Sequence, residues 1–144
     1  MDDESRAGTD ESFDRDDFCF VCGQKNEDGL RVRPRSADGR CTLEWVPPEC
    51  YQGYAGILHG GIISTLLDEA MAHAALSAAG TSPTVEFAVE FLKPVLTGRP
   101  VAVEARVIER RRRIVRTEAE LNQEGELRAR ARGTFITAKG KGVR

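Results

Sequence analysis

The chain has 144 residues, of which 40% are hydrophobic and 31% are charged, and its formal net charge at pH 7 is −2. This length suits a single domain that buries about two-thirds of its unfolded surface. No apolar stretch approaches the roughly 20 residues of a membrane-spanning helix, and the acidic N-terminus lacks the hydrophobic segment of a secretory signal. We therefore expect a cytoplasmic protein with no membrane partner, whose cysteines are reduced thiols.

Acidic residues are concentrated at the N-terminus. Residues 1–17 contain eight Asp or Glu side chains and two Arg side chains, so this segment carries −6 and the rest of the chain carries +4. A segment of low hydrophobicity and high net charge cannot build a core. The sequence thus predicts a disordered acidic tail over residues 1–17, a single domain over residues 18–139 and a short C-terminal tail over residues 140–144.

The domain begins with two expected strands and continues into one long helix. Leu30–Arg35 and Arg40–Val46 are expected to form a hairpin across Asp38-Gly39, a dipeptide typical of tight turns. A helix is expected from near Gly60 to Ala79, and Gly80 would end it.

Four further strands are expected after the helix, and they are Thr84–Leu92, Val101–Glu109, Ile114–Asn122 and Leu127–Ala138. The gaps between them are short, which favours an antiparallel meander over parallel crossovers. The predicted fold class is α+β, with one long helix packed against one antiparallel sheet.

Two faces of the predicted helix carry few charges. With about 100° of rotation per residue, one face is an apolar stripe that should pack on the sheet. Its members are Ile63, Leu66, Leu67, Ala70, Met71, Ala74 and Ala78. The opposite face is dominated by small side chains, namely Ser64, Asp68, Ala72, Ala75 and Ala79. Small residues let another backbone approach closely, so we expect this face to contact a second subunit. Asp68 has no cation three or four residues away to pair with it.

The start of this helix suits acyl transfer. A helix N-terminus presents free backbone N–H groups and a positive dipole end to a carbonyl oxygen that develops negative charge. Gly60 and Gly61 have no side chains that would keep a ligand from those groups. Asp68 follows Gly61 by seven residues, which is about 10 Å along the axis. Because a base and an oxyanion donor must reach one carbonyl, Gly61 of one subunit should pair with Asp68 of another in an obligate dimer.

Four segments, taken together, resemble one known family. They are Cys19-Phe20-Val21-Cys22-Gly23 with Asn26, His59-Gly60-Gly61 followed by Asp68, Thr84-Val85-Glu86-Phe87 through Phe91-Leu92-Lys93-Pro94, and the basic turn after Val107. Their order and spacing resemble the hotdog-fold acyl-CoA thioesterases of the phenylacetate-pathway type. The resemblance implies a long central helix wrapped by a curved antiparallel sheet of five to six strands. It also implies subunits that join their sheets in a homodimer, and a dimer of dimers as the assembly.

The same resemblance implies an activity and roles for individual residues. The substrate would be an acyl-CoA thioester, hydrolysed to a free acid and coenzyme A without any further cofactor. Asp68 would act as general base or nucleophile, and Gly61 would donate its N–H to the thioester oxygen. His59 would join the catalytic set, or it would fix the loop by a hydrogen bond. The expected substrate contacts are Gly60, Gln52 and Thr84.

A run of arginines marks the turn between the second and third strands after the helix. Arg110, Arg111 and Arg112 are expected to hold the phosphates of coenzyme A, which guanidinium groups suit. The alternative is a solvated turn, and an arginine stands where the family often has a glycine. No aromatic platform accompanies these cations, so no nucleic-acid partner is expected.

The cysteines give an incomplete motif. Cys19 and Cys22 have the spacing of half a zinc site, but Cys41 and Cys50 are not spaced as its other half. We therefore expect small buried side chains in an N-terminal lid and no metal.

Other interpretations stay open. Glu69 and His73 stand at i and i+4 and form a rival acid–base pair on a different stripe from Asp68. A non-catalytic acyl-CoA sensor of the same fold would need the pocket but not Asp68. A hotdog dehydratase would place its histidine and its carboxylate differently.

Overall fold

The computed structural model describes residues 13–138. Residues 1–12 of the predicted acidic tail and the whole predicted tail over residues 140–144 lie outside the described residues. The elements in chain order are β1 (Arg35–Ala37), β2 (Arg40–Trp45), the 3₁₀ helix η1 (Glu49–Tyr51), α2 (Gly60–Ala79), β3 (Thr84–Phe91), β4 (Val101–Arg111), β5 (Ile114–Gln123) and β6 (Glu126–Ile136). The predicted order of two strands, one helix and four strands is confirmed.

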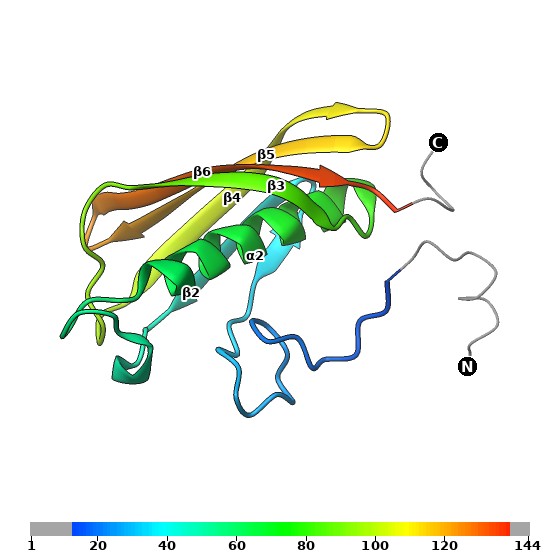
Figure 1. Cartoon of the computed structure of the whole chain (residues 1–144). Helices are drawn as coiled ribbons and strands as arrows, with labels where there is room; N and C mark the ends of the chain where they lie inside the picture. The colour runs from blue at the N-terminus through cyan, green and yellow to red at the C-terminus, as the bar shows by residue number, and fades with distance from the viewer. Residues whose placement is uncertain (1–12, 139–144) are drawn as a thin grey trace.

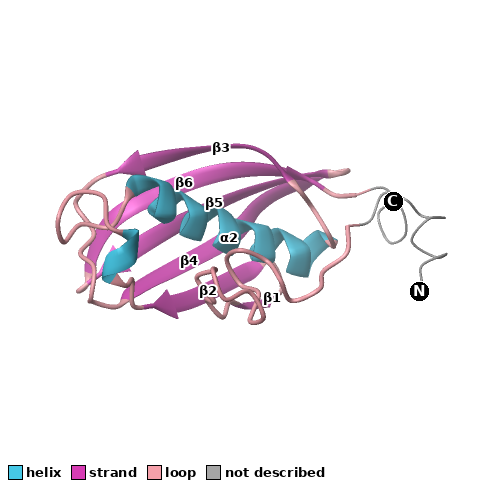
Figure 2. Cartoon of the chain, turned by 60° about the horizontal axis from the view of Figure 1, so that its bottom comes forward, coloured by secondary structure: helices cyan, strands magenta, loops and turns pink. Residues whose placement is uncertain are grey.

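One curved six-stranded sheet carries the helix on its concave face (Figure 1 and Figure 2). Its strand order is β1-β2-β4-β5-β6-β3, and every pair of neighbours is antiparallel. This is the hotdog arrangement, a helix wrapped by a sheet, and it confirms the predicted fold class. Residues from both layers meet in a single apolar core that includes Leu66, Leu67, Met71, Leu121 and Phe135.

The expected meander of the last four strands is correct for β4, β5 and β6 and wrong for β3. Strand β3 pairs with β6 at the far edge of the sheet, two strands away from β4. A link from Leu92 to Pro100 joins β3 to β4, and at about 3.3 Å per residue it can span roughly 30 Å. Crossing two strands requires only about 15 Å at the usual strand spacing. A short link therefore does not force the strands that it joins to be neighbours.

The expected hairpin is shorter than predicted. Its turn at Asp38-Gly39 is confirmed, with φ of 50° and 80°, the left-handed conformation that this dipeptide tolerates. Its first strand, however, covers only Arg35–Ala37. The preceding residues pair elsewhere, because Leu30 N–H donates to Phe20 O at 3.0 Å and Val32 N–H donates to Val21 O at 2.9 Å. The N-terminal segment thus replaces the hairpin partner that we expected.

The helix buries its predicted stripe except for Ala78, and it buries residues of the opposite face as well. Ala75 is fully buried and Ala79 is nearly so, although both were assigned to the subunit-facing side, whereas Ala78 is only half-buried. That part of the prediction was wrong, because the curved sheet and the N-terminal segment enclose the C-terminal half of α2 within the chain itself. Ser64 and Asp68, nearer the start of the helix, remain half-buried. Within residues 13–138, no helix combines the length and apolar character that crossing a membrane requires.

Buried Gln123, at the end of β5, holds the link after β3 in place. Its Oε1 accepts the Leu96 N–H at 2.8 Å, and its Nε2 donates to Leu96 O at 2.9 Å and to Arg99 O at 3.1 Å. Leu96 in turn bridges Ile57, just before the start of α2. The amide therefore positions the loop from which the helix emerges.

Replacing Gln123 with Leu should lower the free energy of unfolding by about 1–3 kcal/mol, because two groups of Leu96 and one of Arg99 lose their hydrogen-bond partner in the buried amide. Denaturant unfolding measures the change. Glu120→Ala, an exposed substitution in the same strand, serves as the control and should stay within about 0.5 kcal/mol. A Gln123→Leu protein as stable as the control would contradict the role assigned to the amide.

Candidate active site

The first turn of α2 is closed by its own cap. His59 is the N-cap residue, and its Nδ1 accepts the Gly61 N–H at 2.8 Å. The N–H groups of Ile62 and Ile63 donate to His59 O. Within residues 13–138 the Gly60 N–H has no hydrogen-bond acceptor. The N-terminal turn of α2, called the helix mouth below, therefore offers two N–H donors. The Gly60 N–H is unpaired among these residues, and the Gly61 N–H becomes available only when a ligand replaces His59 Nδ1 as its acceptor.

Packing keeps this mouth narrow. A Cβ on Gly60 would lie 3.5 Å from the ring of Phe91, and a Cβ on Gly61 would lie 3.1 Å from His59 Nδ1. Sequence reasoning did not single out Phe91 as a site residue, although it ends the β3 strand of the quoted motif. A side chain at position 61 would therefore crowd the His59 imidazole, whereas a Cβ at position 60 would make only ordinary contact with the Phe91 ring.

The predicted contact Gln52 serves the loop before the helix. Its Oε1 accepts the Gly56 N–H at 2.8 Å, and Gly53 beside it packs on His59. The loop also donates the Leu58 N–H to Val95 O at 2.7 Å. Gln52 therefore lies close to the helix mouth, with its side-chain oxygen already engaged.

The structure brings Asp68 and Thr84 together. The Thr84 hydroxyl at the start of β3 donates to Asp68 Oδ1 at 2.8 Å. Burial raises the pKa of Asp68 above its usual value; the Thr84 hydrogen bond opposes this rise, and the neighbouring Glu69 charge adds to it. No cation among the described residues contributes to the pKa of Asp68. A carboxylate without a cation, oriented by one hydroxyl, has the character of a base.

The structure keeps the two halves of the predicted site apart within one chain. Gly61 and Asp68 are both in α2, so about 10 Å of helix lies between them. Neither residue can move toward the other without unwinding two turns. The Asp68–Thr84 pair and the His59–Gly61 pair are therefore two separate half-sites on one chain.

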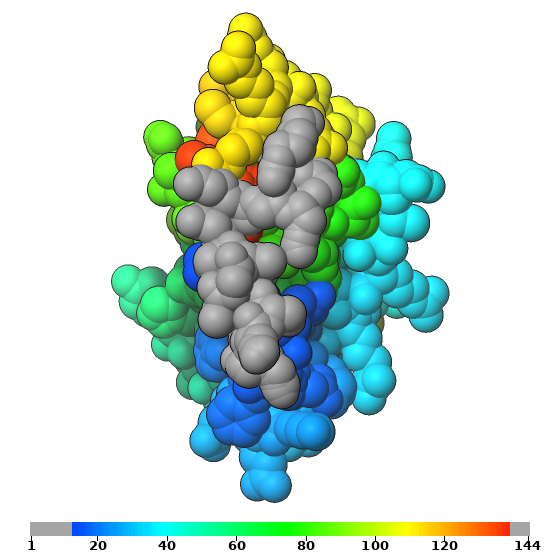
Figure 3. Space-filling view, turned by 90° about the vertical axis from the view of Figure 1, so that its right-hand side faces the viewer, coloured from blue at the N-terminus to red at the C-terminus, as the bar shows by residue number. Residues whose placement is uncertain are grey.

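The predicted arginines lie at the opposite end of α2 from Gly60. Arg110 donates to Ala78 O at 3.0 Å, near the C-terminus of the helix, and Arg111 and Arg112 line a surface hollow beside it. Figure 1 shows the β4–β5 hairpin reaching past this end of the helix, and Figure 3 looks onto that end. Arg112 has φ of 56°, so the turn keeps the left-handed conformation that a glycine would favour. Roughly 27 Å of helix separates these arginines from Gly60 in the same chain.

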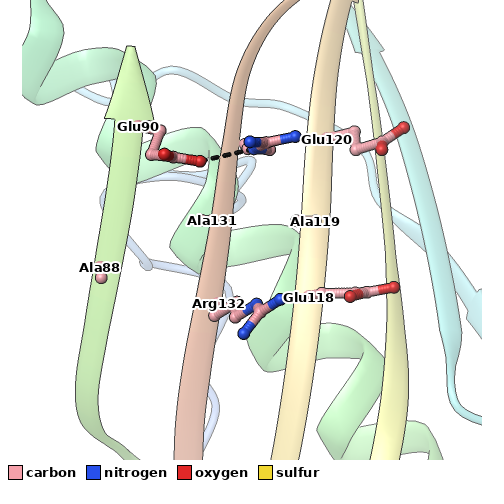
Figure 4. Close-up of a pocket in the computed structure, with 8 residues that line it drawn as sticks. Ala88, Glu90, Glu118, Ala119, Glu120, Ala131 and Arg132 are labelled. Atoms are coloured by element: carbon pink, nitrogen blue, oxygen red, sulfur yellow. Dashed lines mark hydrogen bonds and ion pairs between the residues drawn. The ribbon is translucent and has the colours of Figure 1, made fainter.

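A second hollow lies on the outer face of the sheet, away from α2 (Figure 4). Glutamates and arginines alternate across its strands, and Arg130 donates to Glu90. Ala119 and Ala131 line the hollow between these charges, and their own side chains belong to the buried core on the other face of the sheet. Its lining includes none of the predicted site residues and offers no apolar wall for an acyl chain.

The rival pair Glu69–His73 also exists. His73 Nε2 lies 2.9 Å from Glu69 Oε2, and both side chains are largely buried. Burial alone would raise the pKa of Glu69, but hydrogen bonds from His73 and Cys22 outweigh it and hold that pKa below its usual value. Burial, followed by the Glu69 charge, raises the pKa of Cys22. The pair faces the N-terminal segment, apart from Thr84 and the helix mouth.

Comparison with known proteins identifies the family. Residues 55–129, which include α2 and four of the strands in whole or in part, match the model of the Thioesterase superfamily. The chain belongs to the thioesterase superfamily. A protein of Saccharolobus solfataricus named "Putative esterase" is 31% identical over 106 residues, which are 72% of this chain and 75% of that protein.

Two solved structures share the fold. The phenylacetic acid degradation protein of Thermus thermophilus, solved as a mutant, superposes with a TM-score of 0.71 at 24% identity, covering 75% of this chain and 94% of that one. A Streptococcus mutans protein solved with acetyl CoA gives a TM-score of 0.71 at 21% identity, covering 76% of this chain and 91% of that one. These similarities show that the chain shares its fold with both proteins.

The Asp68–Thr84 contact predicts a directly measurable titration. Asp68 should titrate above the 3.8 of an ordinary aspartate. Thr84→Val should raise its pKa further, because the hydroxyl stabilises the charged form. Carboxyl ¹³C chemical shifts of Asp68 followed against pH measure both values.

Thr42→Val, in the exposed part of β2, is the matched control and should leave the Asp68 titration unchanged. An Asp68 that titrates at or below 3.8 would show that burial does not dominate its environment. A titration that does not respond to Thr84→Val would show that the hydrogen bond is not formed in solution.

Proposed function

We propose that this protein hydrolyses an acyl-CoA thioester to a free carboxylic acid and coenzyme A. The observation that carries the proposal is the Asp68–Thr84 contact, a half-buried carboxylate that a hydroxyl orients and no cation neutralises among the residues described. Membership of the thioesterase superfamily supplies the reaction class. The Streptococcus mutans protein that binds acetyl CoA supports coenzyme A as the carrier.

Asp68 acts as the base in this mechanism. Its ionised carboxylate takes a proton from a water molecule while the water oxygen bonds to the thioester carbon, and the carbonyl electron pair moves to oxygen. The tetrahedral intermediate then breaks its carbon–sulfur bond, the acid is released, and the proton reaches the departing sulfur. Attack by the Asp68 carboxylate itself would instead form an anhydride, which water then cleaves.

The first turn of α2 stabilises the oxyanion. The Gly60 N–H and the helix dipole face the developing charge, and the Gly61 N–H joins them when the oxygen replaces His59 Nδ1 as its acceptor. His59 is exposed, so its ring can turn aside at little cost. In this account His59 fixes the loop and holds the Gly61 donor ready until substrate arrives.

The Asp68 and the helix mouth that serve one thioester belong to different subunits. Among residues 13–138, strand β3 is paired on one side only, and its edge carries exposed apolar side chains, with Val85 and Phe91 each 55% exposed. An apolar, unpaired edge favours pairing with another chain. Joining two β3 edges would bring each Asp68–Thr84 pair toward the partner's helix mouth and form a homodimer.

The arginines of the β4–β5 turn fit the phosphates of coenzyme A. Arg111 and Arg112 are exposed and project from the turn, whereas Arg110 is engaged by the helix C-terminus. Guanidinium groups bind phosphates in a bidentate manner. We assign Arg111 and Arg112 to the nucleotide end of the substrate and Arg110 to holding the turn in place.

Replacing Asp68 with Asn should lower kcat by about 10²–10⁴-fold, because the amide cannot take a proton. Release of free coenzyme A from a panel of acyl-CoA substrates of different acyl length measures the rate. Asp38→Asn is the matched control, since it makes the same chemical change in an exposed turn whose conformation asparagine tolerates.

Equal turnover by the Asp68→Asn and Asp38→Asn proteins would overturn the assignment of Asp68. Tight binding of acyl-CoA by the unaltered protein without any hydrolysis would support the sensor function instead. A circular dichroism spectrum unchanged in both variants confirms that any loss is chemical.

A further inference from the structure

A cluster of four side chains lies outside the thioester site, between the N-terminal segment and the C-terminal half of α2. Ligand atoms of Cys19, Cys22 and Glu69 all lie within 4.8 Å of one another. Cys22 Sγ lies 3.6 Å from His73 Nε2, which in turn lies 2.9 Å from Glu69 Oε2. We propose that Cys19, Cys22, Glu69 and His73 bind one zinc ion that fastens the N-terminal segment to the helix.

The turn that carries the two cysteines is already shaped for a metal. Cys19 Sγ accepts the N–H groups of Val21 at 3.3 Å and of Cys22 at 3.5 Å, which fixes the position of the sulfur in the turn. Gly23 N–H donates to Cys19 O at 2.9 Å and closes the turn. A Cβ on Gly23 would lie 2.3 Å from Cys19 N, so only glycine allows this tight fold. Both sulfur atoms therefore emerge on the same side, toward α2.

Separations in the cluster are close to those of a tetrahedral site. Zinc binds sulfur at about 2.3 Å and nitrogen or oxygen at about 2.0–2.2 Å, so two of its ligand atoms lie about 3.3–3.8 Å apart. The 3.6 Å between Cys22 Sγ and His73 Nε2 already falls in this range. Glu69 and His73 are one helical turn apart, so the helix fixes half of the ligand set. Cys19 Sγ lies within 4.8 Å of the ligand atoms of Cys22 and Glu69, and because Cys19 is exposed its side chain can turn toward the metal and His73.

Charge also favours a divalent cation. Two thiolates, one carboxylate and a neutral imidazole carry −3, which a zinc ion reduces to −1. Zinc binding requires release of the thiol protons and of the proton between His73 and Glu69, and it replaces those protons with metal–ligand bonds. The mixed donor set of sulfur, nitrogen and oxygen is one that zinc accepts.

Such a site would be structural. All four positions are occupied by protein, and neither Asp68 nor the helix mouth contributes a ligand. The metal would join a loop at residues 19–22 to a helix at residues 69–73 and would add its binding free energy to the folded state. This proposal concerns a site separate from the thioesterase centre and stands whether or not the protein hydrolyses acyl-CoA.

The test uses the full chain, purified without a metal-binding tag under a phosphine reductant. Zinc alone, and cobalt(II) alone as a spectroscopic probe, are added to the protein after treatment with a chelator. We expect about one metal ion per chain by elemental analysis, and a thiolate-to-cobalt absorption band with tetrahedral d–d bands. Chelation should lower the midpoint of thermal unfolding, and zinc should restore it.

Variants separate the site from adventitious binding. Cys19→Ser should abolish the thiolate-to-cobalt band that requires both cysteines. Because Cys19 is exposed, this substitution should not unfold the protein, so loss of the band reports loss of the ligand. His73→Ala should weaken zinc binding by about tenfold or more. Cys50→Ser removes another exposed cysteine, in η1, and should leave metal content and spectrum unchanged.

Each of three results would overturn the proposal. They are a zinc content below about a tenth of an equivalent per chain, the absence of a cobalt–thiolate band, and equal metal binding by the Cys19→Ser and Cys50→Ser proteins. Failure of the protein to take up zinc after full reduction of any Cys19–Cys22 disulfide would also overturn it.

Discussion

The rigidity of α2 between its first turn and Asp68 constrains the rest of the proposed site. An α-helix rises about 1.5 Å per residue, so the seven residues from Gly61 to Asp68 hold these groups about 10 Å apart. Backbone hydrogen bonds along the helix and the sheet wrapped around it prevent any shortening (Figure 2). A chain with this helix can present an oxyanion donor and a base, but it cannot direct both to one carbonyl. The proposed chemistry therefore depends on a second copy of the chain.

Several other features are consistent with that constraint. Strand β3 carries Thr84 at one end and Phe91 at the other, so one edge strand contacts both half-sites. The same strand is exposed along its length and has a free edge for another chain. The arginine turn lies at the end of α2 farthest from Gly60 of the same chain. This position is expected if the arginines bind the phosphates of a substrate whose thioester lies in a site built by two subunits.

The sequence predicted these features to different degrees. The helix from Gly60 to Ala79 was predictable because its periodicity, its glycine cap and its neighbouring loop all agree. The edge position of β3 was not, since link length alone does not determine strand order. The burial of Ala75 was missed because a helical wheel does not show how far a sheet curves around a helix.

The residues of the candidate sites were also predictable only in part. Asp68 and Thr84 were found through a motif, and the structure brings them into contact. The hydrogen bond from Gly61 N–H to His59 favours the loop-fixing role that was one of the two considered for His59. The contact between Cys22 and His73 was not foreseen, because it joins residues 51 positions apart and the cysteine spacing was judged against other cysteines alone.

Activity of mixed dimers tests the shared site most directly. Asp68→Asn removes the base, and Gly61→Val would cover the first-turn donors and crowd His59. The two inactive proteins are mixed in equal amounts, and native mass spectrometry confirms that subunits exchange. If each site takes one residue from each chain, half of the dimers regain one site of two, and activity returns to about a quarter of the unaltered value. Exchange without any recovered activity would contradict a site shared between subunits.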